Sequence, residues 1–204
     1  MNFFSMAAKG GFLMIVLLGL SVAALYIIGQ KIWLLYKINE IGDGFMDEVR
    51  QLLAQGRTEE AAQICRRYDY SPLARLVLKG IERKGRPAGD IQVAVENEGN
   101  AEIAKLEKWL PMLATIAGGA PMIGFLGTVL GMIQAFFNMS TAGSNVDINL
   151  LSSGIYTAMV TTVGGLVVGI IAYFGYNYLT SAITTLVHKM ENITVGLTET
   201  LSKQ

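Results

Sequence analysis

PMLATIAGGAPMIGFLGTVLGMIQAFF occupies residues 111–137, and LLSSGIYTAMVTTVGGLVVGIIAYFGYNYLTSAITT occupies residues 150–185. Between Lys108 and Lys189 there is no lysine or arginine, and Asp147 is the one acidic residue. Each apolar run exceeds the roughly 20 residues that cross a bilayer as a helix. The two runs therefore predict a transmembrane hairpin. Both are rich in Gly, Ala and Thr, which let helices approach closely in lipid, so we expect the hairpin to contact other helices.

Another apolar run covers residues 11–36. A secretory signal peptide is an alternative, but its apolar core spans only about 7 to 15 residues, so a retained transmembrane helix is favoured. Lys31 and Lys37, with Trp33 and Tyr36 between them, are typical of snorkelling and aromatic anchors at a membrane interface. We expect that end of the helix to face the cytoplasm.

The distribution of basic residues predicts the orientation. The segment from Lys31 to Lys108 holds thirteen of the sixteen lysines and arginines, and basic residues stay preferentially on the cytoplasmic side. The amino terminus is therefore predicted outside and the carboxyl terminus inside the membrane. The predicted segments are a periplasmic amino terminus (1–10), transmembrane helix 1 (11–36), a cytoplasmic helical domain (37–108), transmembrane helix 2 (109–139), a periplasmic loop (140–150), transmembrane helix 3 (151–176) and a cytoplasmic helix (177–204).

The cytoplasmic segment predicts several helices. One covers residues 44–54, and Thr58, Ser71 and Asp90 are candidate caps for three more. No break is evident before Pro111, so the last of these helices is expected to run straight into the membrane. Its charged residues are expected to form a solvated face; they are Glu96, Glu98, Glu102, Lys105, Glu107 and Lys108.

The third span is longer than a bilayer requires. Residues 148–187 hold no formally charged side chain, so the second half must continue into the cytoplasm as a helix. A polar stripe follows that extension, and it is either a wet helix face or the vestibule of a pore. The stripe comprises Asn177, Thr180, Ser181, Thr184 and Thr185.

Composition narrows the function. With 52% hydrophobic and 16% charged residues the chain lies on the membrane side of the usual mix, and a net charge of zero gives no reason to expect nucleic acid. One cysteine, Cys65, and one histidine, His188, exclude an internal disulfide and a His/Cys metal cluster within the chain. No enzyme motif is present, so we expect no catalytic residue, metal or cofactor.

Small residues share one face of each hairpin helix, and each face carries one threonine at mid-membrane. From the residues alone, these hydroxyls either hydrogen-bond to their own helix or to a neighbouring helix, or line a proton pathway. The small faces around Gly124, Gly127 and Gly131, and around Gly165 and Gly169, should lie against neighbouring helices. Helical spacing places Ala117, Pro121, Gly124, Thr128, Gly131 and Ala135 on the first face, and Ala158, Thr162, Gly165, Gly169 and Ala172 on the second.

LATIAGGAPMIGFLGTVLGMIQAF and GIYTAMVTTVGGLVVGI resemble the paired motifs of the MotA/TolQ/ExbB proton-channel family. Three spans and a short chain are more similar to ExbB or TolQ than to the four-span MotA. The resemblance implies an all-α membrane protein forming a pentamer, whose second and third helices line a cavity. It also implies an ExbD-like single-span partner, usually two copies, that supplies a proton-carrying aspartate. By position, Thr128 and Thr162 match the lining threonines and Pro121 the family proline.

One position departs from the pattern, since many ExbB and TolQ sequences have a glutamate where this chain has Thr157. No carboxylate, lysine or arginine is then expected in the hydrocarbon core. Hydroxyls relay a proton only beside a group that titrates, which argues for a partner.

These observations favour an ExbB-type subunit of a proton-driven motor that energises outer-membrane transport through a TonB-like protein. Alternatives are a TolQ-like or gliding-motor subunit, or a non-conducting scaffold in contact with membrane lipid. The predicted pathway residues are Thr128, Thr162, Thr157 and Thr161, and the predicted packing residues are Pro121, Gly124, Gly127, Gly131, Gly165 and Gly169.

Overall fold

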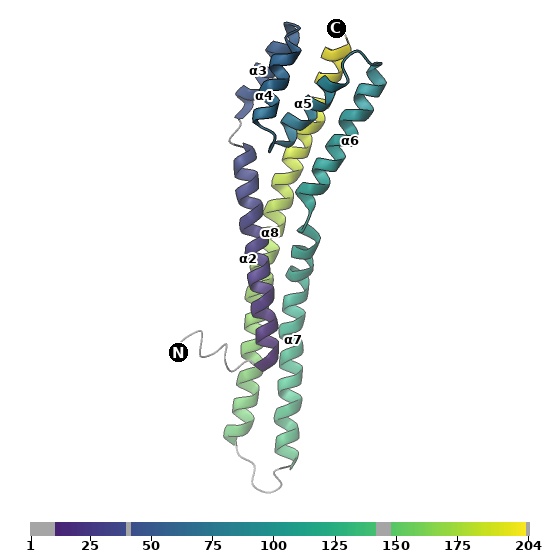
Figure 1. Cartoon of the computed structure of the whole chain (residues 1–204). Coiled ribbons are helices and arrows are strands. Elements are labelled where there is room, and N and C mark those ends of the chain that lie inside the picture. Colours follow the sequence, from purple (N-terminus) through teal and green to yellow (C-terminus); the bar gives the residue numbers. More distant parts are fainter. Residues whose placement is uncertain (1–10, 40–41, 142–147, 203–204) are drawn as a thin grey trace. The chain divides into compact units, whose positions relative to one another are not determined.

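The structure, a computed structural model, describes residues 11–39, 42–141 and 148–202 (Figure 1). Within these ranges all regular structure is helical, which confirms the predicted all-α class. The predicted amino-terminal segment and most of the predicted loop between the last two spans lie outside the described residues. The helices are α2 (Gly11–Asn39), α3 (Gly42–Ala54), α4 (Thr58–Arg67), α5 (Pro72–Glu82), α6 (Ala88–Glu107), α7 (Leu110–Thr141) and α8 (Ile148–Ser202).

Three helical segments among the described residues are long and apolar enough to cross a membrane. They are Phe12–Asn39, Ala88–Thr141 and Leu151–Thr198, and in the second the apolar part belongs to α7. The chain is therefore a multi-pass membrane protein. The exact limits of the spans within these helices stay a prediction.

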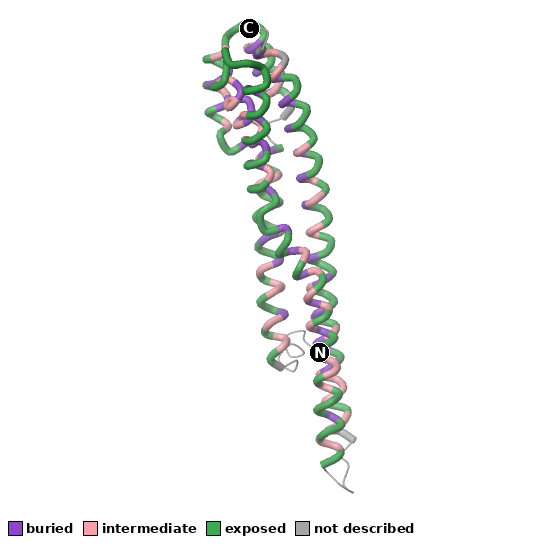
Figure 2. The backbone as a smooth tube through the Cα atoms, turned by 90° about the vertical axis from the view of Figure 1, so that its right-hand side faces the viewer, coloured by how far each residue is buried: buried purple, intermediate pink, exposed green. Residues whose placement is uncertain are grey.

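The chain divides into two compact units, and α2 and α8 contribute to both. The first unit contains residues 11–30 of α2, all of α7 and residues 148–178 of α8. Apolar side chains such as Ile15, Met122 and Phe174 are largely exposed. Figure 2 shows exposed positions along the helices. In a membrane protein these exposed side chains suit lipid or other apolar helices, because hydrocarbon is as apolar as the side chains themselves.

The second unit, Lys31–Lys108 with Leu179–Gln204, packs the short helices around the end of α8. A buried stripe with spacings of three and four residues runs along this part of α8, as expected for one packed face of a helix. Gly80 of α5 lies directly against Leu197, where no larger residue fits without a shift. α8 is one unbroken helix of 55 residues, longer than a bilayer requires, so the predicted helical continuation of the third span is confirmed. The stripe consists of Leu179, Ile183, Leu186, Met190, Ile193, Leu197 and Leu201.

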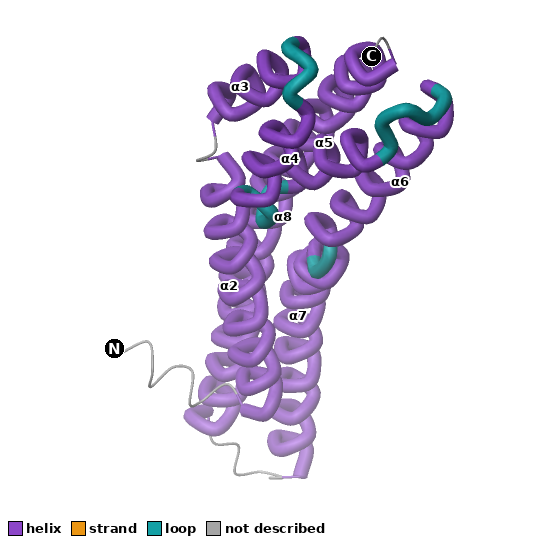
Figure 3. The backbone as a smooth tube through the Cα atoms, turned by 45° about the horizontal axis from the view of Figure 1, so that its top comes forward, coloured by secondary structure: helices purple, strands orange, loops and turns teal. Residues whose placement is uncertain are grey.

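The predicted uninterrupted helix into the membrane is wrong. A short break separates α6 from α7 (Figure 3). The Lys108 N–H bonds the Ala104 carbonyl as the last bond of α6, and Trp109 then takes a left-handed φ of 79°. Pro111 explains the break, because its ring would clash with the carbonyl four residues earlier and it has no N–H to donate. The chain restarts with Trp109 accepting from Leu113 and Pro111 in the first turn.

The predicted caps also need correction. Arg57, Ser71 and Pro87 occupy the N-cap positions of α4, α5 and α6, and none makes a side-chain cap bond. Thr58 is the first residue of α4, and Asp90 lies in the first turn of α6. Ser71 does precede α5, with Pro72 in its first turn, but its hydroxyl is buried without a hydrogen-bond partner. Pattern alone identified where these helices start, but not how their ends are satisfied.

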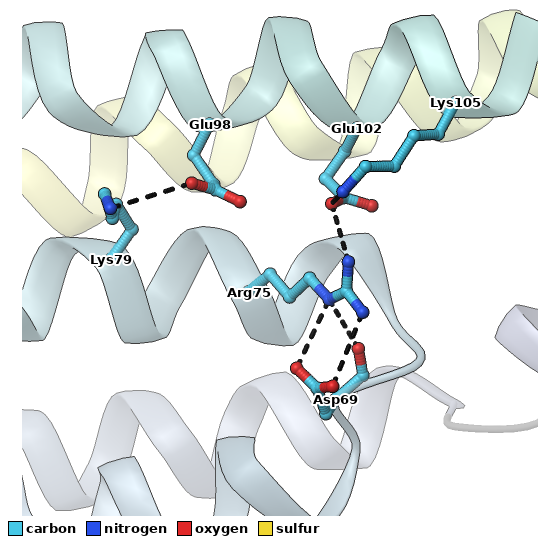
Figure 4. Close-up of polar contacts among 6 residues, drawn as sticks. All are labelled: Asp69, Arg75, Lys79, Glu98, Glu102 and Lys105. Atoms are coloured by element: carbon cyan, nitrogen blue, oxygen red, sulfur yellow. Dashed lines mark hydrogen bonds and ion pairs between the residues drawn. The ribbon is translucent and has the colours of Figure 1, made fainter.

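Not all charges of α6 form a solvated face, and Glu102 is a correction to that prediction. Its side chain is only 6% exposed and accepts from Arg75 at 2.9 Å and from Lys105 at 2.6 Å (Figure 4). Arg75 also donates to the Asp69 carbonyl oxygen at 2.6 Å. The hydrogen bond to Glu102 is the main cause that raises the pKa of Arg75 above its usual value. A buried carboxylate is stable only with such partners, and here one of them, Arg75, comes from α5. The network therefore joins α5 to α6.

The prediction that the Lys31 side chain snorkels to the membrane interface is wrong. Only 4% of it is exposed, and its ammonium donates to the carbonyl oxygens of Leu106 at 2.6 Å and Lys105 at 3.1 Å. Lys37 instead lies over the Tyr70 ring, 4.3 Å from its centroid, and 5.5 Å from that of Trp33. The lysines therefore bind protein groups in the second unit, while the Trp33 ring remains exposed.

Candidate functional site

In the first unit, the two small-residue faces pack on each other, α7 against α8. A Cβ added to Gly165 would lie 2.5 Å from the Ala120 carbonyl oxygen and 2.8 Å from the Cα of Gly124. One added to Gly131 would lie 2.7 Å from the Cβ of Ala158. Glycine is required here because the backbones themselves are in contact, as small-residue interfaces allow in lipid.

Pro121 lies in the same interface. It has no N–H, so the carbonyl of Ala117 has no helical donor from that position. A Cβ on Gly169 would lie 3.0 Å from this carbonyl oxygen and 2.5 Å from Cγ of the Pro121 ring. Gly169 therefore gives the α8 backbone room beside the irregular turn of α7.

Thr128 and Thr162 meet at the centre of the interface. Their hydroxyl oxygens are hydrogen-bond partners. The Thr162 hydroxyl also donates to the Gly124 carbonyl oxygen at 3.0 Å, and the Thr128 hydroxyl lies 3.4 Å from the carbonyl oxygens of Gly124 and Ala158. The two hydroxyls thus bond across the helix pair and not only back to their own helices. Valine would fill the same space with no donor or acceptor.

Both threonines are half-buried within this chain. α7 has no formally charged side chain, and α8 has none before His188. Hydroxyl oxygens can accept and donate hydrogen bonds, but they hold no net charge at neutral pH. Such a pair can therefore orient water or stabilise a titrating group placed beside it. The two hydroxyls alone offer no group that takes up a proton at neutral pH.

The other two predicted pathway threonines, Thr161 and Thr157, differ in burial. Thr161 is buried at 2% exposure, and its hydroxyl donates to the Thr157 carbonyl oxygen at 3.1 Å. Its methyl group lies 2.5 Å from where a Cβ on Gly127 would be, so Gly127 makes room for it. The side chain of Thr157 is half-buried. The role of both in a pathway stays a prediction.

Sequence reasoning missed two parts of this packing. Gly154 extends the α7 contact by another turn, with its Cβ position 2.8 Å from the Cβ of Ala135. Its spacing of four residues before Ala158 could have revealed it. Gly164 lies on another face of α8, where an added Cβ would meet the sulfur of Met14 in α2 at 3.1 Å. In the described part of the chain, no group of three or more His, Cys, Asp or Glu is arranged to hold a metal ion.

The two hairpin helices thus pack through small residues, join two hydroxyls at their contact, and carry no formally charged side chain before His188. The sequence profile of the MotA/TolQ/ExbB proton channel family matches residues 69–192. This region contains α7 and most of α8, and the match covers more than half of the chain. The protein belongs to the MotA/TolQ/ExbB family.

Individual relatives agree with this assignment. A putative biopolymer transport protein ExbB homolog of Methanothermobacter thermautotrophicus is 27% identical over 94% of this chain and 69% of its own length. Putative biopolymer transport protein ExbB-like 3 of Synechocystis is 30% identical over 79% of this chain and 77% of its own length. The Tol-Pal system protein TolQ of Haemophilus influenzae is 34% identical over 52% of this chain and 46% of its own length.

Proposed function

We propose that this chain is an ExbB-type subunit of a proton-driven motor that energises transport across the outer membrane. The observation that carries the proposal is the Thr128–Thr162 pair, half-buried between the apolar parts of two helices that have no formally charged side chain there, in a proton-channel family member. In this proposal, copies of the chain, five by family resemblance, surround the single-span helices of an ExbD-like partner, two by the same resemblance. A TonB-like protein then carries the work to the outer membrane.

The distribution of charged residues supports separate roles for this chain and its proposed partner. A proton moving down the membrane potential releases about 2.3 kcal/mol per 100 mV, but it needs a titrating group to occupy on the way. Between Trp109 and Val187 the only formally charged residue of this chain is Asp147, which lies between the two spans. The partner is therefore proposed to supply the carboxyl group, and Thr128 and Thr162 to stabilise it and its water.

The proposed orientation places the second unit in the cytoplasm. Thirteen of the sixteen basic residues lie in the segment from Lys31 to Lys108, which supports this direction. The membrane is then the inner membrane, with the amino terminus periplasmic and the carboxyl terminus cytoplasmic.

A TolQ-like role is the second candidate, because the Haemophilus TolQ has 34% identity over half of this chain. An ExbB-type and a TolQ-like subunit would form the same kind of proton-driven complex, and the two complexes would differ in the periplasmic protein that they move. Pull-down of the assembled complex with a TonB-like or a Pal-like protein separates them.

Proton flux into liposomes tests the proposal. The chain should be purified with an ExbD-like single-span protein, reconstituted, and compared with the chain alone under an imposed potential. We expect flux only when both are present and its loss when the partner's membrane carboxylate becomes an amide. An intact complex that passes no protons would mean that the chain is a scaffold and not a channel subunit.

A further inference from the structure

The amino group of Lys31 binds the last turn of α6. Lys31 is only 4% exposed, and two of its three donors reach the carbonyl oxygens of Lys105 and Leu106. The contact joins residues 74 and 75 positions apart, within the second unit. We call this contact the Lys31 clamp. Nothing in the proton pathway described above uses it.

The break in the chain explains what a cation does at this place. In an uninterrupted α-helix the same two carbonyls would accept from the N–H groups of Trp109 and Leu110. At Trp109 the backbone leaves helical geometry, with a φ of 79°. Carbonyls at a helix C-terminus carry partial negative charge and need donors. Lys31 therefore caps α6 from another helix, directly before the break.

The last turn of α6 also has side-chain contacts with α5. The Lys105 side chain donates to Glu102, and Glu102 accepts from Arg75 of α5 (Figure 4). The final turn of α6 is thus bound to α5 through side chains and to α2 through its backbone. The residues after it, Lys108 and Trp109, lie outside any helix.

Burying the Lys31 ammonium has a large desolvation cost, so the contact adds little to the free energy of unfolding. Replacing buried ionic groups with apolar residues of similar size often leaves the stability of a protein unchanged or increases it. An ammonium bonded to two carbonyls does, however, define one position of its helix relative to the partner helix. The clamp is therefore better suited to fixing geometry than to holding the unit folded.

We propose that Lys31 is a positioning residue that locks the last turn of α6 to α2, so that the Lys108–Trp109 break becomes the joint between the cytoplasmic helices and α7. This role rests on the proposed proton-driven function. Cytoplasmic helices that are rigid up to this joint would resist movement when the membrane helices work against a load. With the clamp lost, the last turn of α6 would fray and the resistance would fall.

Hydrogen exchange of the assembled complex tests the clamp itself, whatever the complex transports. Lys31→Met keeps the length of the side chain and removes its donors, and Lys31→Arg keeps donors and charge. Lys37→Met is the matched control, since it removes one charge from the same helix. We expect amides at the end of α6, such as that of Lys108, to exchange about tenfold faster in Lys31→Met. Lys31→Arg and Lys37→Met should resemble the wild type, and unchanged exchange in Lys31→Met would overturn the clamp.

Proton flux of the same variants tests the positioning role. Flux in the reconstituted complex should fall roughly two- to thirtyfold in Lys31→Met and recover in Lys31→Arg. Faster exchange with wild-type flux would overturn the role in transport. If the wild-type complex carries no protons, the proposed function fails, while the exchange result still decides whether the clamp exists.

A measurement on the wild-type chain covers the case in which Lys31→Met does not assemble. In the detergent-solubilised complex, an amine-reactive reagent should label Lys105, which is 59% exposed, and spare Lys31. Unfolding in denaturant should make both react. Labelling of Lys31 as fast as Lys105 in the folded complex would contradict the clamp.

Discussion

The contact between α7 and α8 leaves so little room at Gly165 that one methyl group should destabilise the protein. A Cβ there would lie 2.5 Å from the Ala120 carbonyl oxygen and 2.8 Å from the Cα of Gly124. Both atoms are backbone, so the two helices must separate by several tenths of an ångström. Overpacking of this kind costs about 1 to 3 kcal/mol, and the contacts favour the upper half of that range. Alanine regains roughly 1 kcal/mol through its helix propensity, so Gly165→Ala should lower the free energy of unfolding by about 1 to 2 kcal/mol.

Gly118→Ala is the matched control, because an added Cβ at Gly118 meets nothing within 4 Å. It should be neutral or stabilise the protein by up to about 1 kcal/mol. The free energy of unfolding can be measured by reversible SDS titration in mixed micelles, followed by tryptophan fluorescence. Equal values for Gly165→Ala and Gly118→Ala would refute the close contact of the two backbones.

Three further predictions concern orientation and the second unit. In a Cys65→Ala background, a membrane-impermeant thiol reagent added outside should label a cysteine placed at Ser144 and not one at Gly85; the opposite pattern would reverse the proposed topology. Arg75→Met should lower the free energy of unfolding by about 1 to 3 kcal/mol because it removes a partner of the buried Glu102. Arg57→Met, which removes the exposed pair with Glu60, should change it by less than about 0.5 kcal/mol. Equal effects of the two variants would contradict the burial of Glu102. Burial raises the pKa of Cys65 to about 12, so at pH 8 the folded chain should be alkylated roughly a thousandfold more slowly than an exposed thiol. The contribution of the protonated thiol to the free energy of unfolding should fall as pH rises from about 9 towards 12. Fast alkylation of the folded protein would show that Cys65 is not buried.

The sequence was sufficient for the features that depend on length, charge and spacing. Uncharged apolar runs predicted the membrane helices, and spacings of three and four residues predicted which small residues share a face. It could not show that the two faces pack on each other within one chain, with Gly124 against Gly165 and Gly131 against Ala158. Spacing identifies a face of a helix, but the partner of that face depends on three-dimensional packing.

The errors arose where one side chain decides the local structure. The sequence pattern predicts a continuous helix through Pro111, although its missing N–H and its ring favour the break at Lys108 and Trp109. The pattern also predicts Glu102 in water and Lys31 at the membrane interface, because charged residues usually lie there. Arg75, which binds Glu102 from another helix, is 27 positions away, and the carbonyl groups that Lys31 binds are 74 and 75 positions away, beyond any local pattern.

The central claim is that the Thr128–Thr162 pair stabilises protons on their path. Thr128→Val and Thr162→Val together remove both hydroxyls and keep the shape of the side chains. Thr115→Val is the matched control, because that exposed hydroxyl only donates to the Pro111 carbonyl oxygen of its own helix, at 2.9 Å.

Proton flux through the reconstituted complex with its partner, measured at equal assembly, is the most direct test. The account predicts that the double variant loses flux while Thr115→Val keeps it. Wild-type flux in an intact complex of the double variant would contradict a role for these hydroxyls in proton transfer.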